Sequence, residues 1–213
     1  MSVVTTGSHL IVPIKPLHLA KTRLRAAGAA PAAHAALVTS VALDTVEAAR
    51  AARGVAGVVV VTSDARLAGA FAAMGVEVVP DTPSAGLNEA LRHADALLRA
   101  RASVRRVGAL QADLPALRPE DLADALDAAG DDRSHCPDRQ ATGTTLLLAE
   151  PGRPLDPRFG IGSSAAHERS GAKTLHGPWD SLRCDVDTTD DLRAASQLGL
   201  GPRTRSHLAD RPR

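Results

Sequence analysis

Aromatic residues are nearly absent from this sequence. Phe71, Phe159 and Trp179 are the only three in 213 residues, and there is no tyrosine. Hydrophobic residues still make up 44% of the chain, so the core has to be built mainly from alanine, valine and leucine. Such small side chains favour helices packed closely on a sheet, and the chain is long enough to form one domain with a sizeable core.

Net charge is also nearly absent. The formal charge at pH 7 is +1, which gives no electrostatic reason to expect a nucleic-acid or membrane partner. No apolar run approaches the ~20 residues that span a bilayer, and the N-terminus lacks the features of a secretion signal. Cys136 and Cys184 are far apart and outside any CxxC pattern, which favours reduced thiols. We therefore expect a cytoplasmic protein.

Several catalytic signatures are missing as well. The first apolar segment is followed by neither GxGxxG nor GxxxxGK[ST], and no glycine occurs between Gly7 and Gly28. A dehydrogenase of the dinucleotide-binding type and a P-loop enzyme thereby lose their main support. There is no HExxH motif or Cys/His cluster for zinc, and no GxSxG motif for a serine hydrolase.

Strand-like and helix-like segments alternate along the chain. Apolar and β-branched runs predict strands at residues 9–14, 57–62, 76–79, 106–110, 142–150 and 182–187. Helices are predicted at residues 31–52, 63–74, 87–100, 119–129 and 188–199, with a short one at the end of 156–172. This alternation predicts an α/β sandwich with a mainly parallel sheet. We expect a single domain over residues 1–213, with a core at about 9–200 and a solvated basic tail at about 201–213.

Aspartates follow two of the predicted strands, at the sheet edge where ligands bind in such folds. Asp113 ends an apolar run and precedes Leu114-Pro115, although aspartate is also common in turns. In "RCDVDTTDDL", Thr188 or Thr189 can cap the last helix and Asp190 and Asp191 suit its first turn. Asp185 and Asp187 then remain, on one face of an extended segment. Such carboxylates could hold Mg²⁺, which takes one or two of them, or they could be structural.

Two loops carry groups suited to anions. Lys15, Lys21 and Arg23 follow the first strand and could neutralise a triphosphate, or form a solvated basic loop. In "FGIGSSAAH", Gly160 and Gly162 permit close backbone approach, and Ser163 or Ser164 can start a helix whose amides suit a phosphate or carboxylate. The alternative there is an ordinary Gly-Ser turn. The hydroxyls just upstream could line the same pocket or lie on a strand: Thr142, Thr144 and Thr145.

These stretches together resemble the 2-phospho-L-lactate guanylyltransferase family, and within it the actinobacterial phosphoenolpyruvate guanylyltransferase branch of coenzyme F(420) biosynthesis. The resemblance covers roughly residues 10–200, and its most specific elements are LQ-x-DLPAL and FG-x-x-SS-x-x-H. The matching stretches, in order, are PIKPLHLAKTRL, VVVVTSD, PDTPSAGLNEAL, LQADLPAL, ATGTTLLL, RFGIGSSAAHERSGA and LRCDVDTTDDL.

The resemblance implies a three-layer α/β/α nucleotidyltransferase fold of the GT-A-like, nucleotide-diphospho-sugar transferase-like type. It also implies Mg²⁺, and transfer of GMP from GTP to a small phosphorylated acid with loss of pyrophosphate. Phosphoenolpyruvate is the first expectation for that acid and 2-phospho-L-lactate the second. Transfer to another acceptor, such as molybdopterin or a sugar phosphate, and a non-catalytic nucleotide-binding protein are the alternatives. Neither the base preference nor the oligomeric state follows from the sequence.

Residue roles also follow from the resemblance. Asp113 matches a metal-binding aspartate of the family, with Asp185 as the first choice for a second metal ligand and Asp187 as the alternative. The acceptor's carboxylate or phosphate would be held by Thr145, Gly160 and Ser163. The triphosphate would be held by Lys15, Lys21 and Arg23. These three residues and Asp113 are the expected catalytic residues. Gly86 and Asn88 would face the nucleotide. Related molybdenum-cofactor enzymes have a glycine-rich first loop; this chain has Lys-Pro there, so side chains should contribute more of the phosphate contacts.

Overall fold

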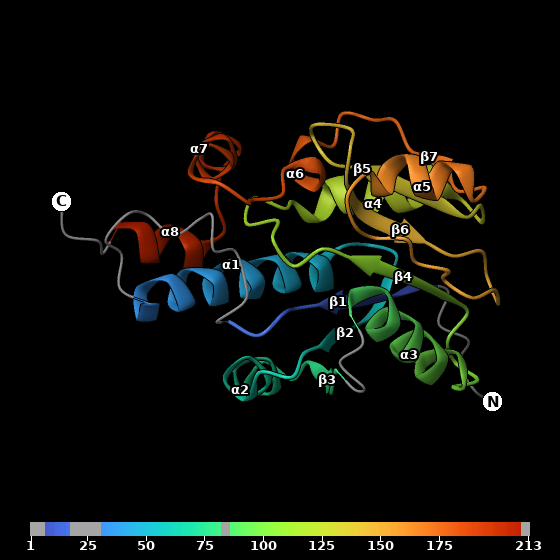
Figure 1. Cartoon of the computed structure of the whole chain (residues 1–213), viewed down its shortest axis with the longest axis horizontal. Helices are drawn as coiled ribbons and strands as arrows, with labels where there is room; N and C mark the ends of the chain where they lie inside the picture. Colours follow the sequence, from blue (N-terminus) through green and yellow to red (C-terminus); the bar gives the residue numbers. More distant parts are fainter. Residues whose placement is uncertain (1–6, 18–30, 82–85, 210–213) are drawn as a thin grey trace.

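A seven-stranded sheet forms the centre of the molecule (Figure 1). The computed structural model describes residues 7–17, 31–81 and 86–209. In spatial order the strands are β3 (Glu77–Val79), β2 (Val55–Val61), β1 (Ser8–Pro13), β4 (Arg106–Leu110), β6 (Thr144–Leu148), β5 (Ser134–Pro137) and β7 (Lys173–Thr174). All neighbours pair in parallel except β6, which is antiparallel to both β4 and β5. The prediction of a mainly parallel sheet is therefore confirmed.

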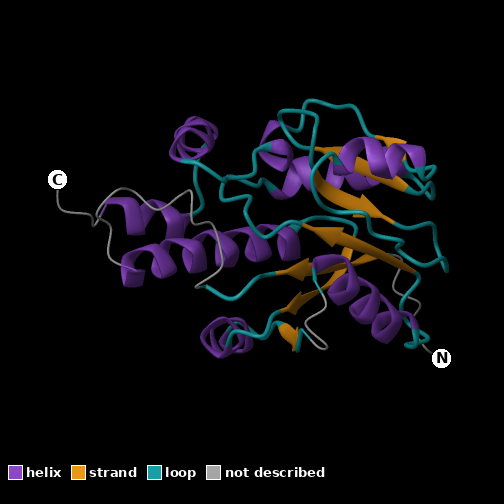
Figure 2. Cartoon of the chain, viewed as in Figure 1, coloured by secondary structure: helices purple, strands orange, loops and turns teal. Residues whose placement is uncertain are grey.

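Helices cover both faces of this sheet, which gives three layers (Figure 2). They are α1 (Pro31–Ala51), α2 (Ala65–Ala73), α3 (Leu87–Arg99), α4 (Pro119–Ala129), α5 (Ser163–Arg169), α6 (Asp180–Arg183), α7 (Thr189–Leu198) and α8 (Pro202–Ala209). Apolar side chains of α1, α2, α4 and α6 share one core cluster, and those of α3 pack with residues 155–172 in a second cluster. The predicted three-layer fold class is confirmed.

The two clusters follow from the two-residue period of the strands. Leu10 and Val12 of β1 belong to the cluster on the α1 side, whereas Ile11 between them belongs to the α3 side. Gly108 in the middle of β4 is needed for space, because a Cβ there would lie 2.7 Å from Leu148 Cδ2 and 2.9 Å from Leu10 Cδ2. Small and aliphatic side chains thus fill the core of a chain that has few aromatic ones.

The parallel strands bring the ends of distant segments to one edge. β1, β2, β3, β4 and β5 all finish at this edge, and antiparallel β6 begins there. The residues that follow β1, β2, β3 and β4, and those that begin β6, therefore lie along a common rim. Figure 1 shows this edge on the side toward which the β1 and β4 arrows point.

One predicted strand is wrong. Residues 182–187 do not form a strand: α6 ends at Arg183, and the chain then continues in irregular form. Helix α6 is favoured because its first residues are bound from elsewhere, with the amide and hydroxyl of Ser181 donating to the Asp121 carboxylate at 3.2 and 2.6 Å. The alternation expected for residues 184–187 nevertheless holds, since Cys184 and Val186 are buried while Asp185 is half-buried and Asp187 exposed.

The basic tail is also not the solvated segment that was expected. Residues 202–209 form α8, which packs beside α1 (Figure 1). The amides of Arg203 and Thr204 donate to the buried Asp44 carboxylate of α1 at 3.2 and 2.7 Å, which completes the start of the helix. This helix could not be predicted from the sequence, because its capping carboxylate comes from another helix, more than 150 residues upstream. Residues 210–213 lie outside the described part of the chain.

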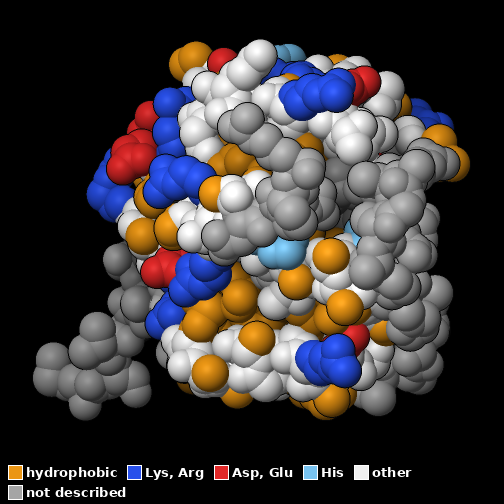
Figure 3. All heavy atoms as spheres, turned by 90° about the vertical axis from the view of Figure 1, so that its left-hand side faces the viewer, with side chains coloured by type: hydrophobic (Ala, Val, Ile, Leu, Met, Phe, Trp, Pro, Cys, Tyr) orange, Lys and Arg blue, Asp and Glu red, His pale blue; other side chains and the backbone are white. Residues whose placement is uncertain are grey.

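The rest of the surface agrees with the composition. On the face in Figure 3, which is the left-hand side of Figure 1, basic and acidic side chains lie next to one another around exposed apolar ones. Both cysteines are buried free thiols. Within the described ranges, no helix is long and apolar enough to cross a membrane.

Candidate active site

Three segments of the chain meet around Asp113, just beyond the end of β4. The amide of Gln111 donates to the Thr145 carbonyl at 2.9 Å, which joins the end of β4 to the start of β6. The amide of Val186 donates to the Asp113 carbonyl at 3.0 Å, which brings the 185–187 segment against the same point. The structure therefore brings together Asp113, Thr145 and the two aspartates that flank Val186.

The aspartates in this region divide into two groups. Thr188 and Asp191 form a reciprocal capping box at the start of α7, and Arg139 pairs with Asp191 at 2.9 Å, so Asp191 serves the helix. The prediction that Thr188 or Thr189 caps this helix is confirmed for Thr188. The capping box is formed by the side chains of Thr188 and Asp191, and the Asp187 amide also donates to the Asp191 carboxylate at 3.3 Å. The side chains of Asp185 and Asp187 are less buried than those of Cys184 and Val186, with which they alternate.

The remaining carboxylates suit a hard divalent cation. Asp113 and Asp185 are half-buried and supply oxygen ligands from two segments joined by a backbone hydrogen bond. Among the described residues, no three His, Cys, Asp or Glu side chains form a group able to hold a metal ion. A pair of carboxylates is a donor set that suits an ion such as Mg²⁺, which takes one or two carboxylates and completes its shell with water and phosphate oxygens. The metal-binding roles of Asp113, Asp185 and Asp187 stay predictions.

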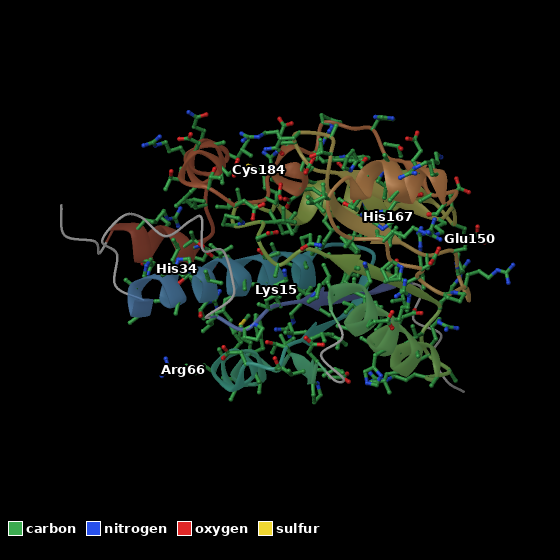
Figure 4. The ribbon with its side chains drawn as sticks, viewed as in Figure 1. Lys15, His34, Arg66, Glu150, His167 and Cys184 are labelled. Atoms are coloured by element: carbon green, nitrogen blue, oxygen red, sulfur yellow. The ribbon has the colours of Figure 1, made fainter. Side chains whose placement is uncertain are left out.

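A pocket of about 310 Å³ lies farther along the rim. Its walls come from the ends of β1, β2 and β3 and from the start of α3: Pro13, Ile14, Lys15, Pro16, Val61, Ser63, Asp81, Gly86, Leu87 and Ala90. Lys15 is exposed and lies near the centre of the view in Figure 4. Gly86 lines the pocket as well; its predicted role in facing the nucleotide stays a prediction. Lys21 and Arg23, the other predicted cations, lie outside the described residues.

Asp64 fixes the loop that carries Lys15, a role that sequence reasoning missed. Its carboxylate accepts the amides of Arg66 and Leu67 at 2.9 and 3.2 Å, as the cap of α2, and also the amide of Leu17 at 3.1 Å. Burial raises the pKa of Asp64, but these backbone hydrogen bonds outweigh it and hold the pKa below its usual value. The only sequence signal was the Ser-Asp pair expected to open this helix.

Asn88 faces a loop rather than open space. Its side-chain nitrogen donates to the Phe159 carbonyl at 3.0 Å, and its oxygen accepts the Phe159 amide at 2.8 Å. The half-buried amide of Asn88 therefore binds the loop of residues 158–162, whose Gly160 is a predicted acceptor residue, and Asn88 follows Gly86 and Leu87 of the pocket in the chain. The predicted contact of Asn88 with the nucleotide stays a prediction. The sequence could not reveal the pair, because 71 residues separate its members.

The predicted acceptor residues lie in this loop, at the start of α5 and on β6. Ser163 is buried, with its hydroxyl 3.2 Å from Thr144 Oγ1, and Thr145 is buried with its hydroxyl donating to the Cys136 carbonyl at 3.4 Å. Gly160 is exposed and adopts a φ of +142°, which favours glycine. The amides of Ser163 and Ser164 donate to the Gly160 and Thr142 carbonyls. The expectation that these first helix amides bind an anion is therefore not supported.

A buried histidine stands behind these residues. His167 of α5 is 0% exposed, its Nδ1 lies 2.9 Å from Thr144 Oγ1, and its Nε2 accepts the Arg158 amide at 2.9 Å. Burial, reinforced by the nearby charges of His135 and Arg133, lowers its pKa to about 4. Neutral imidazole therefore persists in the folded protein at physiological pH. The FG-x-x-SS-x-x-H motif contained this histidine, but its partners became visible only in three dimensions.

Comparison with known proteins shows the family of the chain. The family model described as "Guanylyl transferase CofC like" matches residues 8–210. A Salinispora arenicola protein named phosphoenolpyruvate guanylyltransferase is 52% identical over 199 residues, covering 92% of this chain and 90% of the relative. A Thermomonospora curvata protein of the same name is 51% identical over 205 residues, covering 95% of this chain and 89% of the relative.

Solved structures show the same fold. A Desulfovibrio desulfuricans G20 protein, described as a nucleotide-diphospho-sugar transferase, has a TM-score of 0.73 at 21% identity, covering 97% of this chain and 95% of its own. A Mycobacterium tuberculosis H37Rv protein solved in complex with manganese has a TM-score of 0.54 at 20% identity, covering 90% of this chain and 98% of its own. The chain belongs to the CofC-like guanylyl transferase family and is a nucleotidyltransferase.

Proposed function

We propose that this member of the CofC-like guanylyl transferase family transfers GMP from GTP to phosphoenolpyruvate. The products would be enolpyruvyl-diphospho-5'-guanosine and pyrophosphate, in the cytoplasmic biosynthesis of coenzyme F(420). The observation that carries the proposal is the hydrogen bond from the Val186 amide to the Asp113 carbonyl, 3.0 Å long, which joins two carboxylate-bearing segments beside the nucleotide rim. The curated relatives named for this activity, about half identical to the chain, support the choice of acid.

The reaction is an in-line displacement at phosphorus. A phosphate oxygen of phosphoenolpyruvate attacks the α-phosphorus of GTP, a new P–O bond forms, and the bond to the oxygen that bridges to the β-phosphorus breaks. The electron pair of that bond leaves with pyrophosphate. An ionised phosphate is already nucleophilic, so the proposed reaction requires no general base. Catalysis then depends on alignment of the two substrates and on neutralisation of their charge.

Asp113 and Asp185 would hold a divalent cation, Mg²⁺ in the proposal, with Asp187 as the alternative to Asp185. Bound there, such an ion supplies charge neutralisation for the phosphate groups. The half-burial of Asp113 and Asp185 supports this choice over exposed Asp187, because carboxylates shielded from water interact more strongly with a cation. Lys15, at the mouth of the neighbouring pocket, would add a fixed positive charge for the triphosphate.

The pocket itself supports guanine as the base. Asp81 lines it together with Ser63, Leu87 and the prolines that flank Lys15. A carboxylate accepts hydrogen bonds only, and guanine presents two adjacent donors, N1–H and the 2-amino group. Adenine lacks this donor pair, so Asp81 would favour GTP over ATP. This pocket would bind GTP and the acceptor residues would bind the acid, both within a single nucleotidyltransferase domain that spans the chain.

The test incubates the protein with Mg²⁺, one nucleotide and one acid, and measures both pyrophosphate and the guanylylated product. We expect turnover with GTP and phosphoenolpyruvate, with 2-phospho-L-lactate a poorer acceptor. ITP lacks the 2-amino group and should be used at least about tenfold less efficiently than GTP. Absence of pyrophosphate with every acid would overturn the proposal. Tight GTP binding without turnover would instead support a non-catalytic nucleotide-binding protein.

Substitution of Asp113 makes the test specific to the proposed site. Asp113→Asn keeps the size of the side chain and removes its charge, so it should reduce turnover by at least about a hundredfold while the melting temperature is retained. Asp124→Asn, at an exposed position of α4, is the matched control and should keep full activity. Full activity of the Asp113 variant would exclude this carboxylate from the metal site.

A further inference from the structure

The segment Arg158–Phe159, directly before Gly160, is held from two sides. On one side, Asn88 of α3 binds both backbone groups of Phe159, at 2.8 and 3.0 Å. On the other side, His167 of α5 accepts the Arg158 amide at 2.9 Å and packs edge-on against the Phe159 ring, with ring centroids 5.1 Å apart. Two consecutive residues therefore have their backbone positions fixed by side chains of two different helices. We name Asn88 and His167 the Phe159 clamp.

The Arg158 amide fixes the proton arrangement of His167. A backbone amide can only donate, so His167 Nε2 has to be the unprotonated, accepting nitrogen of a neutral ring. The ring proton then lies on Nδ1 and is donated to Thr144 Oγ1, 2.9 Å away. Thr144 Oγ1 lies 3.2 Å from Ser163 Oγ, so one imidazole orients both the Arg158 backbone and the Thr144–Ser163 hydroxyl pair.

The residues after the clamp need such support. Gly160 and Gly162 both have positive φ, at +142° and +69°, and they flank Ile161, whose side chain is fully exposed. Glycines in these conformations have no Cβ to restrict them, so the path of the loop depends on its anchors. The clamp is the anchor before Gly160, and the Thr144–Ser163 contact is the anchor after Gly162.

We propose that Asn88 and His167 are positioning residues for the phosphorylated acid: through Phe159 and Ser163 they set the position of the loop of residues 158–162 without touching either substrate. The proposal rests on the proposed function for the identity of the acid. It gives Asn88 a role on the acceptor side, although Asn88 immediately follows residues that line the nucleotide pocket. Weakening of the clamp should therefore affect use of the acid and leave binding of GTP nearly unchanged.

Three substitutions separate the contacts of the clamp. His167→Gln places an acceptor near the position of Nε2 and loses the bond to Thr144, whereas His167→Asn places a donor near the position of Nδ1 and loses the bond to Arg158. Asn88→Asp keeps an acceptor for the Phe159 amide and removes the donor to the Phe159 carbonyl. His176→Asn, at an exposed position, is the matched control.

The kinetic measurement is KM for phosphoenolpyruvate at saturating GTP, and KM for GTP at saturating acid. Each clamp variant should raise the KM for the acid by about tenfold, the effect of one lost hydrogen bond in a positioned site, with the KM for GTP within about twofold of wild type. Equal increases in both KM values would indicate general structural damage and overturn the proposal. An increase confined to the KM for GTP in Asn88→Asp would do the same, since it would make Asn88 a nucleotide contact.

Amide hydrogen exchange tests the clamp without relying on turnover. In the wild type, the amides of Arg158 and Phe159 should exchange slowly; His167→Asn should speed exchange at Arg158, and Asn88→Asp should leave Phe159 protected. Rapid exchange of both amides in the wild type would overturn the proposal even if the enzyme is active. If the Arg158 and Phe159 amides are protected in a protein that transfers no GMP, the proposed function is contradicted, whereas the hydrogen bonds of the Phe159 clamp are supported. If a His167 variant does not fold, half-buried Asn88 provides the kinetic answer.

Discussion

The buried histidine of α5 should make the protein sensitive to mild acid. Burial, together with the nearby charge of His135, lowers the pKa of His167 from its ordinary 6.5 to about 4. As the pH falls below 6.5, the unfolded chain takes up a proton at this imidazole, whereas the folded protein does so only near pH 4. The stability contributed by neutral His167 is therefore fully present above pH 6.5 and is lost as the pH falls through this window.

The size of the effect follows from the same two values. Each pH unit between them corresponds to about 1.4 kcal/mol, so the full window corresponds to a loss of about 3 kcal/mol in the free energy of unfolding. That is a large part of the roughly 5–15 kcal/mol that stabilises an ordinary domain. The structural reason is local: a second ring proton on Nε2 would point at the Arg158 amide, which is itself a donor.

Urea denaturation at several pH values from above 6.5 down to about 4 measures this loss. The wild type should lose about 3 kcal/mol more than His167→Asn across the window, because asparagine does not titrate. His176→Asn, which changes an exposed imidazole, should follow the wild type. The other titratable groups of the wild type are all present in His167→Asn as well, so they cancel in the comparison of these two proteins. An identical pH dependence in the wild type and His167→Asn would refute the reasoning.

Asp64 and Asp44 both accept hydrogen bonds from backbone amides, and we expect each to stabilise a different helix: Asp64 stabilises α2 and Asp44 stabilises α8. Asp64→Ala should lower the free energy of unfolding by about 1–2 kcal/mol in urea denaturation and raise the KM for GTP, because it removes both the α2 cap and the hydrogen bond to the Leu17 amide. Asp64→Ser can still cap α2, so it should restore the stability while the KM for GTP stays raised. An unchanged KM for GTP in both variants would limit the role of Asp64 to the helix cap. Asp44→Ala should lower the free energy of unfolding by about 1–3 kcal/mol and speed amide exchange in α8. Glu47→Ala should have a smaller effect, because the exposed Glu47 carboxylate pairs with the Arg203 side chain of that helix. Equal effects of the two variants would contradict a capping role for Asp44.

The parts of the fold that the sequence predicts are those set by local pattern. Strands such as β2 and β4 have apolar runs that end in turn residues, and the observed bounds lie close to the expected ones. The rim that carries Asp113 follows from the same reasoning, because parallel strands end at one edge. The Asp185–Asp187 alternation also survives, although no strand forms there, since one backbone hydrogen bond and a buried Val186 suffice to orient the segment.

The parts that the sequence missed depend on partners far away in the chain. β5 is short and polar, with Ser134 and His135 at 0% exposure, and it becomes a strand because β6 and β7 lie on either side of it. α8 depends on the Asp44 carboxylate, and the side chain of Asn88 binds the backbone of Phe159. Pairings of this kind leave no periodic signal along the sequence, and a polar side chain that serves a backbone looks the same as one that serves a ligand.

The Leu114-Pro115 turn shows why the C-terminal elements belong to the candidate site. Backbone and side-chain groups from four separate places hold the turn: Thr45 Oγ1 accepts the Leu114 amide at 3.1 Å, Ser181 Oγ accepts the Arg118 amide at 2.9 Å, the Val186 amide donates to the Asp113 carbonyl at 3.0 Å, and the Gly201 amide donates to the Pro115 carbonyl at 2.7 Å. Three of these four partners come from residues after 180. The end of β4 brings Asp113 to the rim, and contacts from Ser181, Val186 and Gly201 then fix the backbone of the loop that follows it. The C-terminal third of the chain therefore stabilises the position of the carboxylate on which the proposed chemistry depends.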